Sequence, residues 1–88
     1  MSVVRVVVTR TGGFAGVTRQ AEEDDPGRAE RLSDAVRASA GSAADGRARD
    51  VFVYEFALVT TTATERIDLG ESAMDATLRR AVRALFAP

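Results

Sequence analysis

Apolar and polar positions along the chain follow two different periods, one typical of strands and one of helices. The run from Val3 to Thr9 is short and rich in β-branched residues, which is typical of a strand buried on at least one face. Residues 10–16 then hold three of the seven glycines. Because residues 17–21 again favour an extended chain, residues 3–21 are predicted to form a β-hairpin with a long loop.

The next segment has the features of a helix that follows an acidic start. Residues 22–25 are all acidic and end at Asp25, which is followed by Pro26. A carboxylate N-cap and a proline at the first helical position are a strong start signal, and acidic groups suit the positive end of the helix dipole. Gly41 is expected to end this helix, which is therefore predicted over residues 26–40. Apolar residues recur at helical spacing at Ala29, Leu32, Val36 and Ala40.

Residues 51–60 form the strongest predicted strand, and residues 41–49 before them show no periodic apolar pattern, so they are expected to form a loop. Residues 64–69 alternate in the same way as the strand and should complete a second hairpin with it. The core face of the strand is predicted to carry its three aromatic residues, Phe52, Tyr54 and Phe56, together with Leu58. The opposite face carries Val51, Val53, Glu55, Ala57 and Val59.

A second helix is predicted over residues 73–86, with Ser72 as N-cap and Asp75 completing a capping box. Its apolar stripe consists of Met74, Leu78, Ala81, Val82 and Leu85, with Arg79, Arg80 and Arg83 on the other side. The element order is thus β-β-α-β-β-α. The expected α+β fold is a four-stranded antiparallel sheet of two hairpins with both helices packed on one face. Residues 1–88 should form a single domain.

Composition argues against catalysis. The 88 residues include no histidine and no cysteine. The commonest general base, the strongest nucleophile and the two best zinc ligands are therefore absent. We expect a protein that is not an enzyme, acts by binding, and holds no metal or cofactor.

Charge and hydropathy also limit the partners. The net charge of −1 gives little reason to expect nucleic acid or an anionic membrane as a partner. No apolar stretch approaches the roughly 18 residues of a membrane helix, and the N-terminal residues lack the pattern of a signal peptide. The simplest expectation is a cytoplasmic protein, either a monomer or a weak dimer.

The segment from Thr11 to Gly16 is the most distinctive motif, because its glycines permit positive φ angles and close backbone approach. A P-loop would need Gly-Lys-Ser/Thr, but Val17 follows the last glycine. A dinucleotide fingerprint would need a glycine in place of Thr11 and a helix after it. Neither phosphate motif is present.

Two interpretations of Phe14 in this segment remain open. In the first, the glycines only shape a hairpin bend and Phe14 folds back onto the core. In the second, Phe14 is an aromatic anchor presented to a pocket of a partner protein. The acidic residues 22–25 and the arginines of the second helix are most simply solvated surfaces of their helices.

The valine-rich first strand followed by Arg-Thr-Gly-Gly-Phe-Ala-Gly-Val-Thr-Arg at residues 10–19 resembles the emfourin-like family of proteinaceous inhibitors of thermolysin-type metalloproteases. Phe52-Val53-Tyr54 and the leucines from Leu78 to Leu85 stand where that family has an aromatic strand and a leucine-rich C-terminal helix. Residues 41–50 lack the proline-rich stretch of the family pattern.

The resemblance implies an inhibitor of a thermolysin-like zinc metalloprotease. Our hypothesis for its mechanism is that the Gly-Gly-Phe-Ala-Gly loop at residues 12–16 enters the active-site cleft. In this hypothesis Phe14 fills an apolar substrate pocket, and Arg10 and Arg19 pair with acidic groups at the rim of the cleft. The implied contact residues are Arg10, Thr11, Gly12, Gly13, Phe14, Ala15, Gly16 and Arg19. The alternative is a scaffold or regulatory protein that binds a partner chain through its open sheet face or an edge strand.

Overall fold

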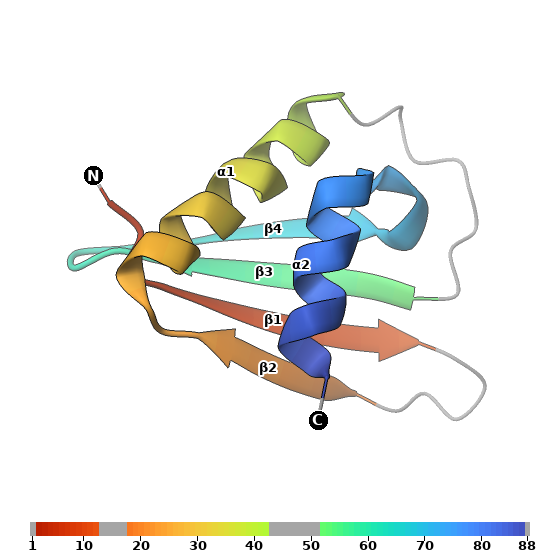
Figure 1. The fold of residues 1–88 in the computed structure, drawn as a ribbon, viewed down its shortest axis with the longest axis horizontal. Helices are drawn as coiled ribbons and strands as arrows, with labels where there is room; N and C mark the ends of the chain where they lie inside the picture. The colour runs from red at the N-terminus through yellow and green to blue at the C-terminus, as the bar shows by residue number, and fades with distance from the viewer. Residues whose placement is uncertain (1, 13–17, 43–51, 88) are drawn as a thin grey trace.

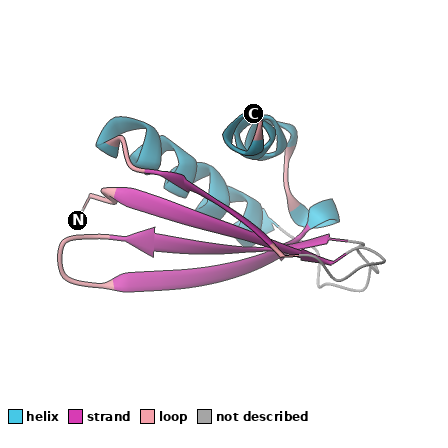
Figure 2. Cartoon of the chain, turned by 90° about the horizontal axis from the view of Figure 1, so that it is seen from below, coloured by secondary structure: helices cyan, strands magenta, loops and turns pink. Residues whose placement is uncertain are grey.

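A computed structural model describes residues 2–12, 18–42 and 52–87 of the chain. The four strands form one antiparallel sheet in the order β2-β1-β3-β4, and both long helices cover the same face of it (Figures 1 and 2). This arrangement confirms the predicted α+β fold and its β-β-α-β-β-α order. The elements are β1 (Arg5–Gly12), β2 (Arg19–Glu23), α1 (Pro26–Ser42), β3 (Phe52–Val59), β4 (Thr64–Gly70), a short 3-10 turn η1 (Glu71–Ala73) and α2 (Ala76–Phe86).

The register of the sheet places the aromatic residues of β3 under the helices. Val8 of β1 and Ile67 of β4 flank Phe56, which is fully buried. Alternation along β3 is as predicted, because Val53 on the opposite face is 43% exposed. Figure 2 shows both helices on the same side of the sheet. The buried apolar core consists of Val3, Val6, Val8, Ala29, Leu32, Val36, Tyr54, Phe56, Leu58, Leu69, Met74, Leu78 and Val82.

The acidic run is divided between β2 and the turn before α1. Glu22 and Glu23 belong to β2, which begins two residues later than the extended segment predicted at residues 17–21. The start of α1 is confirmed: the Arg28 backbone N–H donates to Asp25 Oδ2 at 3.0 Å. This bond satisfies one of the helix's otherwise unpaired amide groups.

The end of α1 differs from the prediction. Gly41 lies inside the helix, which continues to Ser42, and its φ is not positive, so it does not act as a stop. Ala40, predicted to continue the apolar face, is exposed, and Ser39 is buried instead. Both residues are compatible with the spacing, because residues three and four positions after Val36 lie on the same side of the helix. Ser39 is the one that faces α2, where it accepts a hydrogen bond from the Asp75 backbone N–H. Most of the loop expected at residues 41–49 lies outside the described residues.

The start of α2 is also a correction, because Asp75 and not Ser72 is the N-cap. The Leu78 backbone N–H donates to Asp75 Oδ1 at 2.8 Å. Ser72 lies within η1, which separates β4 from the helix. A 3-10 turn and the buried Met74 take up these residues, so the helix begins three residues later than expected. No helix in the described parts of the chain has the length and apolar character needed to cross a membrane.

Candidate functional site

Four of the eight predicted contact residues lie at the adjoining ends of β1 and β2. Arg10, Thr11 and Gly12 end β1, and Arg19 begins β2. Arg10 and Arg19 are directly paired in the antiparallel register. Gly13, Phe14, Ala15 and Gly16 lie outside the described residues. The strand pairing therefore holds Arg10 and Arg19, which flank the Gly-Gly-Phe-Ala-Gly segment.

Gly12 has a backbone conformation that other residues avoid. Its φ is 128°, while it still pairs with Phe52 of β3. A side chain at this φ would clash with the backbone, so only glycine adopts it at low cost. The first glycine of the motif is thus required by the path of the chain as it leaves β1.

The side chains of Arg10 and Arg19 lie on the helix-covered face, beside aromatic rings. The Arg10 Cζ atom is 4.7 Å from the centroid of the Phe52 ring and 5.5 Å from that of Phe86. The Arg19 Cζ atom lies 5.7 Å from the Phe86 centroid. Phe86 reaches both arginines because α2 crosses the sheet from η1 toward β2 and ends above them (Figure 1). Cation–π contacts of this kind hold a guanidinium in a defined orientation.

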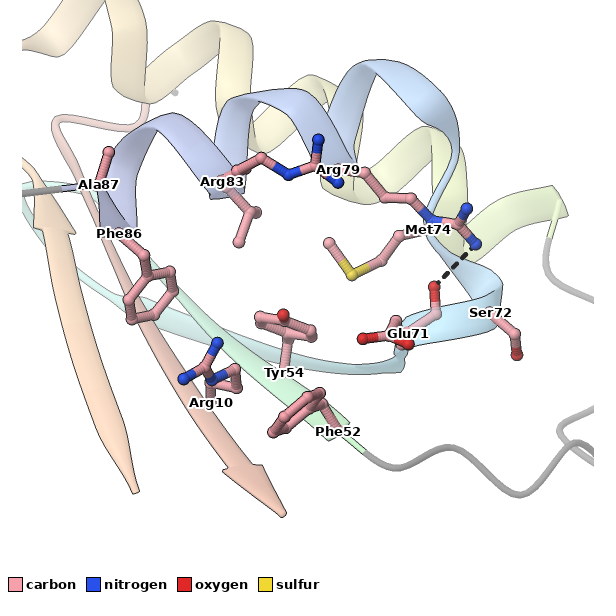
Figure 3. A pocket seen from close by; sticks show the side chains of 11 residues that line it. Arg10, Phe52, Tyr54, Glu71, Ser72, Met74, Arg79, Arg83, Phe86 and Ala87 are labelled. Carbon is pink, nitrogen blue, oxygen red and sulfur yellow. Dashed lines mark hydrogen bonds between the residues drawn. The ribbon is translucent and has the colours of Figure 1, made fainter. Parts of the chain in front are cut away.

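Arg10 also borders an open groove of about 760 Å³ beneath α2. Figure 3 shows Phe52, Tyr54 and Met74 on one side of this groove and Arg79 and Arg83 projecting from α2 on the other. Phe86 closes one end, with its ring 6.5 Å from that of Tyr54 in an edge-on arrangement. We call this the arginine groove: it is lined by Arg10, Phe52, Tyr54, Met74, Arg79, Val82, Arg83 and Phe86, together with Glu71, Ser72 and Ala87.

The positive charges at the arginine groove have no carboxylate partner among the described residues. The ion pairs among the described residues lie outside the groove. They join Arg5 to Glu22, Arg37 to Glu65 and Arg66 to Glu55. Arg79 donates instead to the backbone carbonyl of Glu71, with 3.1 Å between Nη2 and O. Arg10 Nε is buried and faces no hydrogen-bond acceptor within the described parts of the chain. The groove is therefore cationic and incompletely satisfied.

A second groove, of about 540 Å³, runs between the two helices and is mainly apolar. Its lining includes Leu32, Ala35, Ala81 and Leu85. The described residues include no group of three or more acidic side chains placed to hold a metal ion. Among the described residues, the features that combine positive charge with aromatic rings lie at the β1–β2 end and in the arginine groove.

Sequence reasoning did not identify the arginine groove or the role of Phe86. Arg79, Arg80 and Arg83 are all exposed, as expected of a solvated surface, but Arg79 and Arg83 also border the groove while Arg80 does not. A signal was present, because Arg79, Arg83 and Phe86 follow one another at helical spacings of four and three residues. That spacing places two cations and an aromatic ring along one side of the helix.

Comparison with protein-family models tests the family resemblance of the motif at residues 10–19. The family model described as Emfourin matches residues 8–85, nearly the whole chain. The chain belongs to the Emfourin family. No curated protein and no solved structure matches it. Membership supports a role as a protease inhibitor in general. The matched region includes the complete motif at residues 10–19 and every residue that lines the arginine groove except Phe86 and Ala87.

Proposed function

We propose that this Emfourin-family protein inhibits a thermolysin-like zinc metalloprotease by placing residues 12–16 in its active-site cleft. The observation that carries the proposal is the family match over residues 8–85, which includes the whole Gly-Gly-Phe-Ala-Gly motif. The conformation of Gly12 supports it, because its φ of 128° at the end of β1 is one that glycine adopts at low cost, and it sets the backbone direction at the first residue of the motif.

In the proposed mechanism Phe14 is the anchor. Thermolysin-like enzymes favour large apolar side chains immediately after the bond they cleave, and Phe14 meets that preference. The segment lies between two strands that are paired from Val6–Glu23 to Arg10–Arg19, so the arginines on either side of it have a fixed separation. Fixed ends reduce the conformational entropy lost on binding, which strengthens the complex and keeps the segment from adopting a geometry that the protease cleaves.

The two arginines have unequal parts in this mechanism. Arg19 is exposed, which supports a part in pairing with an acidic group at the rim of the cleft. Arg10 is partly buried between aromatic rings and holds the end of β1 against Phe86. We therefore assign rim recognition mainly to Arg19 at this end of the sheet, and a supporting part to Arg10.

The decisive test measures inhibition and stability on the same variant. Purified protein is titrated into several thermolysin-like proteases and residual activity is assayed, first with the unmodified chain and then with Phe14→Ala. If Phe14 is an anchor, the inhibition constant should rise by about thirty-fold or more, the equivalent of roughly 2 kcal/mol. The melting temperature should change little.

Two outcomes would contradict the proposal. If the unmodified chain inhibits none of the proteases, the assignment of the protease class is wrong. If Phe14→Ala lowers the melting temperature markedly but inhibits normally at low temperature, Phe14 belongs to the core and not to the contact surface. Phe14→Leu is the matched control, because it retains a large apolar side chain and should keep most of the inhibition.

The open face of the sheet supports the alternative of a scaffold protein less well. Val53 is exposed there, but its surroundings are polar and internally paired. Gln20 Nε2 donates to Thr9 Oγ1 at 3.1 Å, and Arg66 Nη1 lies 3.5 Å from Glu55 Oε1. A face with such pairs is well solvated and offers only a small apolar area to a partner.

A further inference from the structure

We propose that the arginine groove is a second contact surface of the inhibitor and receives an acidic side chain, with an apolar neighbour, from the partner protease. This inference rests on the proposed function and adds a contact outside residues 12–16. It follows from three properties of the groove: its uncompensated charge, its preorganised arginine and its position beside the proposed inhibitory segment.

The charge of the groove is opposite to that of the chain as a whole. The full sequence carries a net charge of −1, whereas the groove is lined by Arg10, Arg79 and Arg83 against the single carboxylate of Glu71. Within the described residues, none of the three arginines forms an ion pair. A protein that gathers cations locally without pairing them presents a site for an anionic group.

Arg10 is already held in place for such a group. Its guanidinium lies against the rings of Phe52 and Phe86, and its Nε has no hydrogen-bond acceptor among the described residues. The planar guanidinium binds a carboxylate through two parallel N–H donors, and a guanidinium whose position is fixed loses little entropy when it does so. Arg79 and Arg83 border the same groove from the helix side (Figure 3). The Arg79 guanidinium is turned toward the Glu71 carbonyl, and because both arginines are exposed, each can change its side-chain rotamer toward a carboxylate bound by Arg10.

The remaining lining selects an apolar neighbour for the acidic group. Phe52, Tyr54, Met74 and Val82 provide aromatic and aliphatic contacts between the cations. Methionine adapts to irregular shapes, and tyrosine and arginine are the residue types most often found at the centre of protein interfaces. A segment with one acidic and one apolar side chain close together satisfies both parts of the groove.

The position of the groove identifies the protease as the source of that segment. Arg10 lines the groove and lies two residues before Gly12, where the proposed inhibitory segment begins. The groove is partly open to solvent and is not an enclosed cavity, which suits contact with a protein surface. A protease engaged at the β1–β2 end therefore lies next to the groove, and the two contacts form one continuous surface.

The test uses charge reversal on one helix with a matched control on the same helix. Arg79→Glu combined with Arg83→Glu reverses the charge of the groove, and Arg80→Glu makes the same kind of change at an exposed position that does not line it. Against a thermolysin-like protease that the unmodified chain inhibits, the double variant should raise the inhibition constant by roughly thirty-fold or more at low salt. The single Arg80→Glu variant should change it by less than about three-fold.

Two further measurements distinguish a specific groove contact from other causes of weaker inhibition. The salt dependence of inhibition tests the electrostatic contribution, and neutral substitutions test whether misfolding is responsible. Raising the salt concentration from about 0.05 M to 0.5 M should weaken inhibition by the unmodified chain, and should weaken it much less for the double variant. Arg83→Gln should weaken inhibition more than Arg80→Gln, with the melting temperatures of both close to that of the unmodified chain. These neutral variants keep the test valid if the double reversal lowers stability.

The outcomes distinguish the two proposals. If the unmodified chain inhibits no thermolysin-like protease, the proposed function is wrong and the groove loses its assigned partner. If the unmodified chain inhibits but the groove variants match the Arg80 controls, only the groove inference is wrong.

Discussion

Gly12 has an unusual backbone conformation and is also the first residue of the proposed inhibitory segment. Its φ of 128° is the only positive φ among the described residues. It also remains in register with Phe52, so the unusual conformation occurs while the strand is still paired. The glycine therefore sets the direction in which the chain leaves the sheet, next to the aromatic ring that packs on Arg10.

Gly12→Ala should lower the free energy of unfolding by about 1–2 kcal/mol, because alanine at a positive φ clashes with its own backbone. Gly41→Ala is the matched control. An added Cβ there meets nothing within 4 Å, and the residue lies in α1 without a positive φ. Alanine at this helical position should be neutral or stabilising by up to about 1 kcal/mol. Urea denaturation of both variants checks the difference, and equal effects would contradict the assignment.

At the scale of elements, the start of α2 depends on α1. Asp75 accepts a hydrogen bond from the Leu78 backbone N–H, and its own backbone N–H donates to Ser39 Oγ at 3.2 Å. Ser39 is fully buried in the last turns of α1. The two helices are thus joined at the N-terminus of α2, which fixes where the helix begins and how it crosses the sheet toward Arg10 and Arg19.

Asp75→Ala should lower the free energy of unfolding by about 1 kcal/mol, within the range of 0.5–2 kcal/mol for a lost N-cap. Asp75→Asn is the control, because an asparagine side chain keeps an oxygen that accepts the bond from Leu78. The stability of the asparagine variant should stay close to that of the unmodified chain. Thermal unfolding followed by circular dichroism measures both, and an equal loss in the two variants would show that the charge, and not the cap, is responsible.

The periodic pattern predicted the existence, order and type of all four strands and both long helices. It did not predict where α1 ends or where α2 begins. Gly41 is expected to end α1 and Ser72 to cap α2, but α1 continues to Ser42 and Asp75 caps α2. Both Ser72 and Asp75 are good N-cap residues by type, and the choice of Asp75 depends on η1 and on a contact with Ser39, 36 residues away in the chain. Such contacts are tertiary, so local sequence rules do not contain them.

The candidate site was predictable only where it is local. The Gly-Gly-Phe-Ala-Gly motif is contiguous, so it identified the family and the β1–β2 end. The arginine groove joins Arg10 of β1, Phe52 of β3 and Phe86 of α2, residues that are far apart in the sequence. Their meeting depends on the direction in which α2 crosses the sheet, which hydrophobic periodicity alone does not determine.

At the scale of the whole molecule, one two-layer core supports both proposed contacts. The helices cover one face of the sheet (Figure 2). A single buried cluster contains residues of three strands, β1, β3 and β4, and of both helices. β1 lies at the centre of the sheet between β2 and β3, so the Arg10 end of the site is held from both sides. Recognition at the edge of the molecule therefore depends on packing at its centre.

Phe56 and Val53 on the same strand test this two-layer organisation. Phe56 is fully buried and Val53 is 43% exposed on the open face. Phe56→Ala should lower the free energy of unfolding by about 3–5 kcal/mol, since it removes an aromatic side chain and leaves a cavity. That is a large part of the roughly 5–15 kcal/mol typical of a folded domain. Val53→Ala should cost less than about 1 kcal/mol, because most of the valine stays in contact with water. Urea denaturation measures both. Comparable losses of stability in the two variants would mean that the open face is covered, in solution, by a partner or a second copy of the chain.

Phe56→Ala should affect inhibition only through stability. Phe56 packs on Tyr54 in the core and pairs with Val8 of β1, whereas Gly12 pairs with Phe52. Any loss of inhibition by Phe56→Ala should therefore disappear under conditions where the variant is fully folded.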